Sequence, residues 1–300
     1  MIAADLAGRP TSRIGFGCGR LVGGVARRQS FALIETALEL GIRHFDTAPS
    51  YGLGSSEDVL GAALAGVNDV TIVTKVGLAR PRGASLSALA RQMLRPLLSG
   101  APAVKARVAR LAPSSPCTPL TSAPLRASFE ESLRRLKRDR VTGALLHEIE
   151  PASLDPEARD EVESWRRRGL TEAIGSGTGG TCGALTAFSE IAQYRFEPGE
   201  PPPTARWRIL HGALRRRPTP ALYSAAQIAA FRRLGRDFAD PSAWPGVVLT
   251  LALAQAPDAI LLVSSTRPDR LRSALAGVDW SMAARPSPED IRTLRNAIDV

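Results

Sequence analysis

Short runs of apolar and β-branched residues alternate along this chain with longer segments of helical periodicity. The short runs predict eight strands, at residues 13–17, 42–45, 70–74, 141–146, 170–175, 191–196, 207–211 and 259–263. Segments with apolar residues at every third or fourth position predict helices at residues 31–40, 125–136, 156–168, 225–238 and 245–255. Because eight parallel strands with intervening helices close on themselves, the pattern predicts an α/β fold, a (β/α)8 TIM barrel.

The length of the chain favours one barrel over two domains. Three hundred residues are many for an ordinary core but normal for this barrel, so we predict a single domain over residues 1–300. Residues 78–124 are too long for a simple strand-to-helix loop and are rich in Pro, Ala, Ser and Arg. We expect them to form a long insertion after the third strand that lies over the catalytic face, either partly helical around residues 86–98 or with a disordered tip. The proline-rich residues 197–206 predict a second irregular loop on that face.

Polar side chains follow three consecutive predicted strands. Asp46 comes directly after residues 42–45, and Tyr51 lies five residues further on. Lys75 and His147 follow the next two strands in the same way. Because the carboxyl ends of parallel strands meet at the edge where ligands bind, we expect these four side chains to share one site.

Lysine is rare in this chain, which makes its presence at a strand end informative. Only three of the 39 basic residues are lysines, at Lys75, Lys105 and Lys137. An ammonium group is a compact point charge that fits a tight polar cluster, whereas a guanidinium group is a planar fork that does not lose its proton. The choice of lysine at position 75 therefore supports a polar cluster there.

Several segments together resemble the aldo-keto reductase family. Its members carry a DTAxxYG segment, a strand ending in TK and a strand ending in LLH, and the corresponding residues here are 46–52, 74–75 and 145–147. Further similarity lies in residues 54–57, 59–64 and 125–136. The resemblance implies the same barrel and an NAD(P)H-dependent reduction of an aldehyde or ketone, or the reverse oxidation of an alcohol.

The resemblance also implies roles for the four strand-end residues. Tyr51 would be the general acid in reduction and the general base in oxidation, and Lys75 would stabilise its anion. Asp46 would hold the Lys75 ammonium in place, and His147 would orient the carbonyl group. Because negative charge builds on a carbonyl oxygen that accepts a hydride, a stabilised phenol of this kind suits the chemistry.

A nicotinamide cofactor is expected because no side chain donates a hydride. By the same resemblance, Gln193 would contact its carboxamide and Arg270 would bind the adenosine 2′-phosphate, which predicts a preference for NADP(H) over NAD(H). Ser176, Ser264 and Ser265 are further expected contacts, although turn or cap roles suit the last two serines equally.

Two cofactor segments depart from the family pattern. The family usually has Ser-Asn after the fifth strand, whereas this chain has glycines at Gly175 and Gly177 on either side of Ser176. Where the family has an acidic residue and an asparagine after the arginine, this chain has Ser273 and Ala274. These departures leave two alternatives open: a barrel of this family that catalyses a cofactor-independent elimination or isomerisation in a biosynthetic pathway, and a regulatory barrel that senses cofactor.

The remaining composition bears on partners and location. The formal net charge is +10, but the arginines are scattered and no nucleic-acid-binding motif accompanies them, so we expect a solvated basic surface and no nucleic-acid partner. Three separated cysteines without metal-ligand spacing, and no long apolar span, predict a cytoplasmic protein with no metal site and no membrane segment. Cys18 is expected to be a small buried side chain rather than a nucleophile. The pattern leaves the substrate and the oligomeric state open.

Overall fold

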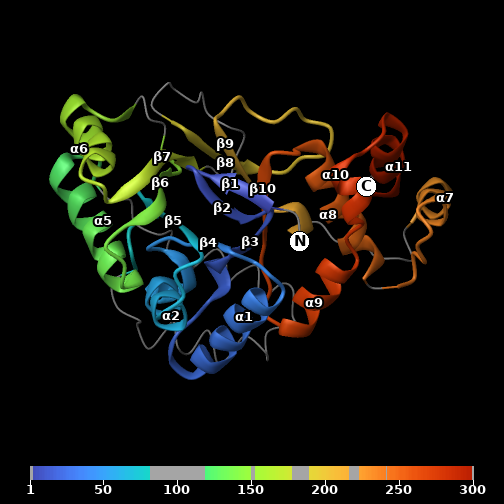
Figure 1. The fold of residues 1–300 in the computed structure, drawn as a ribbon, viewed down its shortest axis with the longest axis horizontal. Helices are drawn as coiled ribbons and strands as arrows, with labels where there is room; N and C mark the ends of the chain where they lie inside the picture. The colour runs from blue at the N-terminus through green and yellow to red at the C-terminus, as the bar shows by residue number, and fades with distance from the viewer. Residues whose placement is uncertain are drawn as a thin grey trace, which may run out of the picture.

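Eight parallel strands form a closed barrel in the computed structural model (Figure 1). The strands are β3 (Ile14–Gly17), β4 (His44–Asp46), β5 (Thr71–Val76), β6 (Val141–His147), β7 (Thr171–Gly177), β8 (Ile191–Arg195), β9 (Trp207–His211) and β10 (Ala259–Val263). They pair in chain order, and β10 closes the barrel by pairing with β3. The predicted TIM barrel is therefore confirmed. The structure describes residues 3–81, 119–149, 153–177, 189–215, 223–240 and 242–298.

Helices surround the barrel on its outer side (Figure 1). They are α1 (Arg27–Glu39), α2 (Ser56–Ala63), α5 (Ser122–Leu136), α6 (Pro156–Arg167), α7 (Ala225–Arg233), α8 (Ala243–Gln255), α9 (Pro268–Ala276), α10 (Trp280–Ala284) and α11 (Pro288–Ile298). The predicted stop of α1 is confirmed, because Gly41 follows it with a φ of 79°, which glycine adopts without strain. Helix α8 is buried almost all round because it packs against α9, α10, α11 and the barrel.

A hairpin that the sequence pattern did not predict precedes the barrel. Its strands, β1 (Ala3–Leu6) and β2 (Arg9–Ser12), are antiparallel, and β2 leads directly into the start of β3. Leu6 is fully buried in the same cluster as the interior residues of the barrel, so the hairpin covers the amino ends of the strands. With one large apolar side chain in eight strand residues, the segment lacks the pattern from which strands are recognised.

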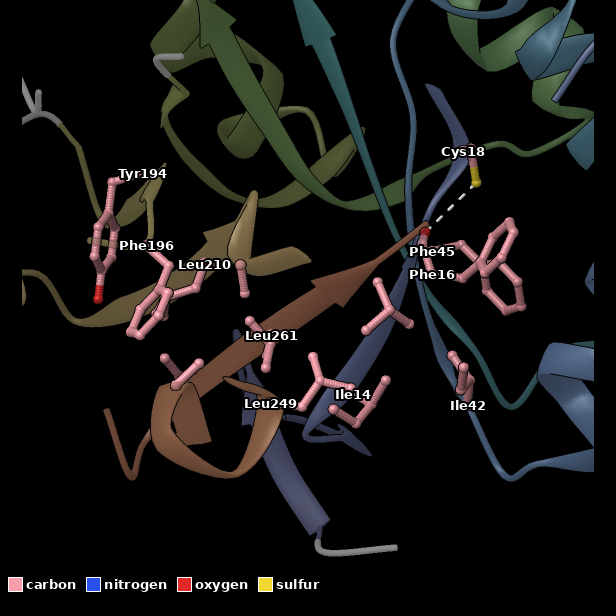
Figure 2. Close-up of a cluster of buried hydrophobic side chains, with 14 of the residues drawn as sticks. Ile14, Phe16, Cys18, Ile42, Phe45, Tyr194, Phe196, Leu210, Leu249 and Leu261 are labelled. Atoms are coloured by element: carbon pink, nitrogen blue, oxygen red, sulfur yellow. Dashed lines mark hydrogen bonds between the residues drawn. The ribbon is translucent and has the colours of Figure 1, made fainter. Parts of the chain in front are cut away.

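Two apolar layers hold the barrel together. The inner layer contains Val73, Leu145, Ala173, Ile191, Ile209, Ile260 and Leu262. The outer layer lies between strands and helices, and Figure 2 shows part of it, where Leu249 of α8 lies near Leu261 of β10 and Ile14 of β3. Because successive strand residues point to opposite faces, the same strands that supply the inner layer can place polar side chains inside the barrel at their carboxyl ends.

Several predicted element bounds differ from those in the structure. Strand β7 extends to Gly177, whereas the sequence pattern ended it at residue 175, because glycines weaken a strand pattern. Helix α7 ends at Arg233 instead of residue 238, since Gly235 takes a φ of 64°. The connection between β8 and β9, residues 196–206, contains neither helix nor strand, as the irregular loop predicted for residues 197–206 requires. Most of the predicted insertion, residues 82–118, lies outside the described residues.

Candidate active site

The carboxyl ends of four barrel strands carry the polar side chains of this site. Asp46 ends β4, Lys75 lies one residue before the end of β5, His147 ends β6 and Gln193 lies in β8. All four are at least nine-tenths buried. Only groups that are paired or hydrogen-bonded tolerate such burial, so the contacts among these side chains determine what the site can do.

A buried ion pair forms the base of the site. The Lys75 ammonium donates to Asp46 Oδ1 over 2.6 Å and to the Thr47 carbonyl over 3.0 Å. Burial by itself would lower the pKa of Lys75, but the Asp46 carboxylate and the Tyr51 phenol outweigh it and raise that pKa above its ordinary value. Lys75 therefore stays positively charged at neutral pH.

Tyr51 begins the short helical turn after β4, Tyr51–Gly54, which bends the chain back over the barrel end. Gly52 takes a φ of 56°, and a Cβ on it would lie 1.7 Å from the carbonyl oxygen of Leu21, so no other residue fits there. On the opposite side of the turn, Arg80 donates to the Gly54 carbonyl and pairs with the fully buried Glu57. The turn that carries Tyr51 is thus held by a close backbone approach at Gly52 and by the Arg80 side chain at Gly54.

The phenol of Tyr51 lies beside the buried ion pair. Lys75 Nζ is 4.9 Å from the centroid of the Tyr51 ring. Burial raises the pKa of Tyr51, and the Lys75 charge offsets this rise only in part. The phenol is therefore protonated at neutral pH, which is the form that can donate a proton.

His147 packs edge-on against Tyr51. The two ring centroids are 5.7 Å apart and the ring planes are at 86°. Burial, together with the Lys75 charge and then His211, lowers the pKa of His147 to about 3. The imidazole is consequently neutral in the working pH range and can donate one hydrogen bond without carrying charge.

A second neutral histidine lies one layer deeper, on β4. His44 is fully buried, its Nδ1 lies 2.9 Å from the Thr71 hydroxyl, and burial with the Lys75 charge lowers its pKa to about 3. An unfolded histidine titrates near about 6.5, so below that pH the unfolded chain binds protons that the folded protein does not. The free energy of unfolding should therefore fall as the pH drops from about 6.5 towards 3.

This linkage gives a measurable difference between two variants. Between pH 6 and pH 5 we expect His44 to account for about 1 kcal/mol of the fall in unfolding free energy. Urea unfolding of the His44→Gln variant should show a pH dependence that is shallower by this amount. A variant whose pH dependence equals that of the parent protein would mean that His44 is not neutral in the folded state.

The strand-end residues line one cavity of about 970 Å³. It extends from Tyr51, Asp46 and His147 to the segments that follow β9 and β10. The four residues predicted to act together are thus brought together, three of them on the cavity wall and Lys75 directly behind Asp46. Such a cavity, with a few converging polar groups, is the usual form of a small-molecule site.

The sequence that forms this site matches the model of a known protein family. The aldo/keto reductase family model covers residues 13–179, which include β3 to β7 and all four of these residues. The chain belongs to the aldo/keto reductase family. The resemblance drawn from the sequence motifs is therefore confirmed.

Curated relatives and solved structures agree with this family. The chain is 32% identical over 193 residues to a D-threo-aldose 1-dehydrogenase from a Pseudomonas species, which covers 59% of this chain and 53% of that protein. It is 30% identical over 178 residues to the L-galactose dehydrogenase of Arabidopsis thaliana, covering 56% and 45% of the two proteins. The matched part thus spans about half the length of these relatives.

Solved structures of this family share the fold at low sequence identity. The holo form of the aldo-keto reductase AKR11C1 from Bacillus halodurans has a TM-score of 0.68 at 18% identity, over 99% of this chain and 96% of its own. The glycerol dehydrogenase AKR11B4 from Gluconobacter oxydans has a TM-score of 0.66 at 18% identity, over 98% and 94%. At this identity the likeness shows the fold alone.

Four of the five residues predicted to contact the cofactor line the cavity, and one does not. Gln193, Ser264, Ser265 and Arg270 all line the cavity. Ser176 is not among the lining residues, and its hydroxyl instead accepts a hydrogen bond of 3.5 Å from Ser189. Because side chains alternate along β7, Ser176 points away from the barrel interior that Gly175 and Gly177 face.

The two serines after β10 already make hydrogen bonds within the protein. Ser264 donates to the Gly17 carbonyl at the end of β3 over 2.8 Å, and Ser265 donates to the Arg267 carbonyl over 2.8 Å. Ser265 therefore has a turn role, whereas Ser264 joins the ends of β10 and β3. The exposed guanidinium of Arg270, in contrast, has no acidic partner within the described ranges, so it is available to an anion at the cavity wall.

The charged or titratable residues of the cavity that were not predicted from the sequence include Arg20, Glu148, His211 and Arg267. His211 ends β9, so the rule that identified Asp46 and His147 would also have found it. Glu148 follows His147 in a strained backbone conformation with a φ of 57°. The other two lie in irregular segments, whose direction no periodic pattern indicates.

Cys18 lies outside the reactive part of this family member's site. It is fully buried after β3, and its thiol donates to the Phe16 carbonyl over 3.6 Å (Figure 2). Burial raises the pKa of this thiol well above its ordinary value, so the reactive thiolate does not form at neutral pH.

The part of the chain that the structure describes has neither a metal-binding cluster nor a membrane-spanning helix. No group of three or more His, Cys, Asp or Glu side chains is arranged to hold a metal ion. None of the described helices is both long and apolar enough to span a bilayer.

Proposed function

We propose that this protein is an NAD(P)H-dependent oxidoreductase that reduces an aldehyde or ketone, or oxidises the corresponding alcohol, with Tyr51 as the general acid and base. The observation that carries the proposal is the buried Asp46–Lys75 pair, which lies beside the Tyr51 ring at the wall of the cavity. A buried charge placed next to a titratable phenol is the arrangement that proton transfer at a carbonyl oxygen needs.

Each residue of the site has a separate role in moving the proton. A bound reduced nicotinamide would supply the hydride to the carbonyl carbon. As negative charge builds on the carbonyl oxygen, Tyr51 gives it the phenolic proton, and the Lys75 ammonium stabilises the tyrosinate that remains. The neutral His147 donates a hydrogen bond to the same oxygen and orients it. In alcohol oxidation the tyrosinate takes the proton back.

Other residues that line the cavity suit the nicotinamide cofactor. Gln193 offers an amide to the nicotinamide carboxamide, and Arg270 offers a guanidinium to a phosphate. Ser264 and Ser265 line the same cavity. Arg270 supports a preference for NADP(H) over NAD(H), because only the former carries a 2′-phosphate.

The cofactor preference can be tested at Arg270. We expect Arg270→Met to raise the Kd for NADPH by about tenfold or more, since a charge-assisted contact contributes about 1.5–3 kcal/mol, and to leave the Kd for NADH within about twofold. Quenching of tryptophan fluorescence on titration with each cofactor measures both constants. Arg28→Met, an exposed change on α1 outside the cavity, is the matched control. Equal effects on the two cofactors would contradict a 2′-phosphate contact.

The names of the relatives favour one substrate class within this function. The D-threo-aldose and L-galactose dehydrogenases act on sugars, and the cavity near Tyr51 presents the polar side chains of Arg20, Glu148 and His211. We therefore propose that polyhydroxylated small molecules are substrates, oxidised at the anomeric carbon. We place the reaction in the cytoplasm, as the cysteine pattern predicted.

A single assay tests the function as a whole. The purified protein is mixed with NADP⁺ or NAD⁺ and a panel of aldoses, and with NADPH or NADH and a panel of simple aldehydes and ketones. The near-ultraviolet absorbance of the reduced cofactor measures turnover, because it rises when the aldose is oxidised and falls when the aldehyde or ketone is reduced. Absence of turnover with every pair, together with no cofactor binding at millimolar concentration, would overturn the proposal and favour cofactor-independent proton transfer.

A further inference from the structure

Both oxygens of the Asp46 carboxylate are occupied by donors from different strands. Lys75 Nζ donates to Oδ1 over 2.6 Å, and Gln193 Nε2 donates to Oδ2 over 2.9 Å. The exposed fraction is only 2% for Asp46, 1% for Lys75 and 3% for Gln193. Gln193 lies 147 positions from Asp46 in the chain, so this contact exists only because the barrel closes.

A glycine on the neighbouring strand gives Gln193 the room to reach Asp46. Gly177 of β7 and Gln193 of β8 are partners in the sheet register. A Cβ added to Gly177 would lie 2.7 Å from Gln193 Oε1, closer than non-bonded atoms approach. Any side chain at position 177 would therefore displace the Gln193 amide from its place against Asp46.

The second donor determines the orientation of the carboxylate. A carboxylate held at one oxygen can rotate about its terminal torsion, which is broad, whereas a carboxylate held at both oxygens has a fixed plane. In a buried site each hydrogen bond to the anion also keeps it ionised. A fixed, ionised Asp46 in turn fixes the position and charge of the Lys75 ammonium beside Tyr51.

We propose that Gln193 is a positioning residue that acts through Asp46 to hold the Lys75 ammonium against Tyr51, and that Gly177 is required for this contact. This role is additional to the cofactor contact expected from the sequence, and it is exerted before any cofactor binds. Its catalytic consequence rests on the function proposed above, whereas the effect on Lys75 does not.

The small number of lysines makes the effect on Lys75 directly measurable. In protein labelled with ¹³C- and ¹⁵N-lysine, the whole chain gives three side-chain signals, from Lys75, Lys105 and Lys137. The Lys75→Met variant assigns the Lys75 signal by its loss. Titration of that signal by NMR, in the absence of cofactor and substrate, gives the pKa of Lys75 itself.

Two variants remove the contact in different ways. Gln193→Leu deletes the donor, and Gly177→Ala keeps the glutamine but pushes its amide away. In both we expect the measured pKa of Lys75 to fall by about one pH unit, because the Asp46 carboxylate is then free to turn Oδ1 away from the ammonium that it now contacts at 2.6 Å. Gln255→Leu, a half-buried change at the end of α8 away from the cavity, should leave the Lys75 signal in place.

Activity measurements then separate positioning from cofactor contact. Under the proposed function, Gly177→Ala and Gln193→Leu lower kcat by about tenfold or more and move the basic limb of the kcat–pH profile. An unchanged Lys75 titration in both variants, with only a raised cofactor Kd, would overturn the proposal. If the protein has no carbonyl activity at all, the Lys75 titration still decides the positioning role. If Gln193→Leu does not fold, Gly177→Ala gives the same test.

Discussion

Replacing Tyr51 by phenylalanine should lower kcat/KM for carbonyl reduction by about a thousandfold, because the reaction loses its general acid, a contribution of about 10²–10⁴. The change removes one oxygen atom and keeps the ring that packs against His147. Cofactor affinity and the unfolding midpoint should therefore stay close to those of the parent protein. Steady-state kinetics with a sugar and with a simple aldehyde measures the loss.

Tyr223→Phe provides the matched control for this experiment. Tyr223 packs against Phe231 and Phe238, away from the cavity. We expect its activity within about twofold of the parent, as for a substitution outside the site. Retention of more than a tenth of the parent activity in Tyr51→Phe would show that the phenol is not the acid, and the proposed mechanism would be wrong.

Replacing Lys75 by methionine should abolish turnover and also destabilise the protein, because the buried Asp46 carboxylate then has no counter-ion and keeps only its hydrogen bond from Gln193. Breaking a buried pair in this way costs about 3–5 kcal/mol. Replacing both partners, as in Asp46→Leu with Lys75→Met, should recover most of this stability but no activity. Urea unfolding of the two single variants and the double variant measures the coupling between the partners.

An exposed pair in the same protein gives the comparison. Arg43 and Asp69 are joined by a contact of 2.9 Å at the surface, with side-chain exposures of 35% and 71%. Removal of this pair by Asp69→Asn should change the unfolding free energy by less than about 1 kcal/mol. A loss in Lys75→Met no larger than in Asp69→Asn would contradict the view that the Asp46–Lys75 pair is a dry, tightly held contact.

The sequence pattern predicted the barrel well because its strands are buried on both faces. Such strands appear as continuous apolar runs, and polar residues at their ends, such as Asp46, Lys75 and His147, then stand out. The same reasoning fails where burial comes from one side chain, as in the β1–β2 hairpin around Leu6. It fails also for α2, α9 and α10, which are short, whereas α11 is amphipathic and its periodicity would have supported a helix.

Contacts between distant strands were the part of the site that the sequence pattern did not contain. Gln193 was expected to meet the cofactor, but its bond to Asp46 depends on the register of β7 and β8 and on the absence of a side chain at Gly177. Ser176 was expected near the cofactor, yet the inclusion of both neighbouring glycines in β7 turns its side chain outward. Whether a side chain such as Ser176 faces into or out of the barrel depends on whether the strand still includes it, and the end of a strand is its least predictable feature.

The turn that carries Tyr51 has a consequence for how this protein can diversify. Its shape depends on the close approach of Gly52 to the Leu21 carbonyl and on the hydrogen bond from the Arg80 guanidinium to the Gly54 carbonyl. Other side chains that line the cavity, such as Arg20 and Glu148, take no part in these contacts. Substrate preference can therefore be exchanged by substitution at the cavity wall while the reactive phenol keeps its place, so that new specificities can arise without rebuilding the chemistry.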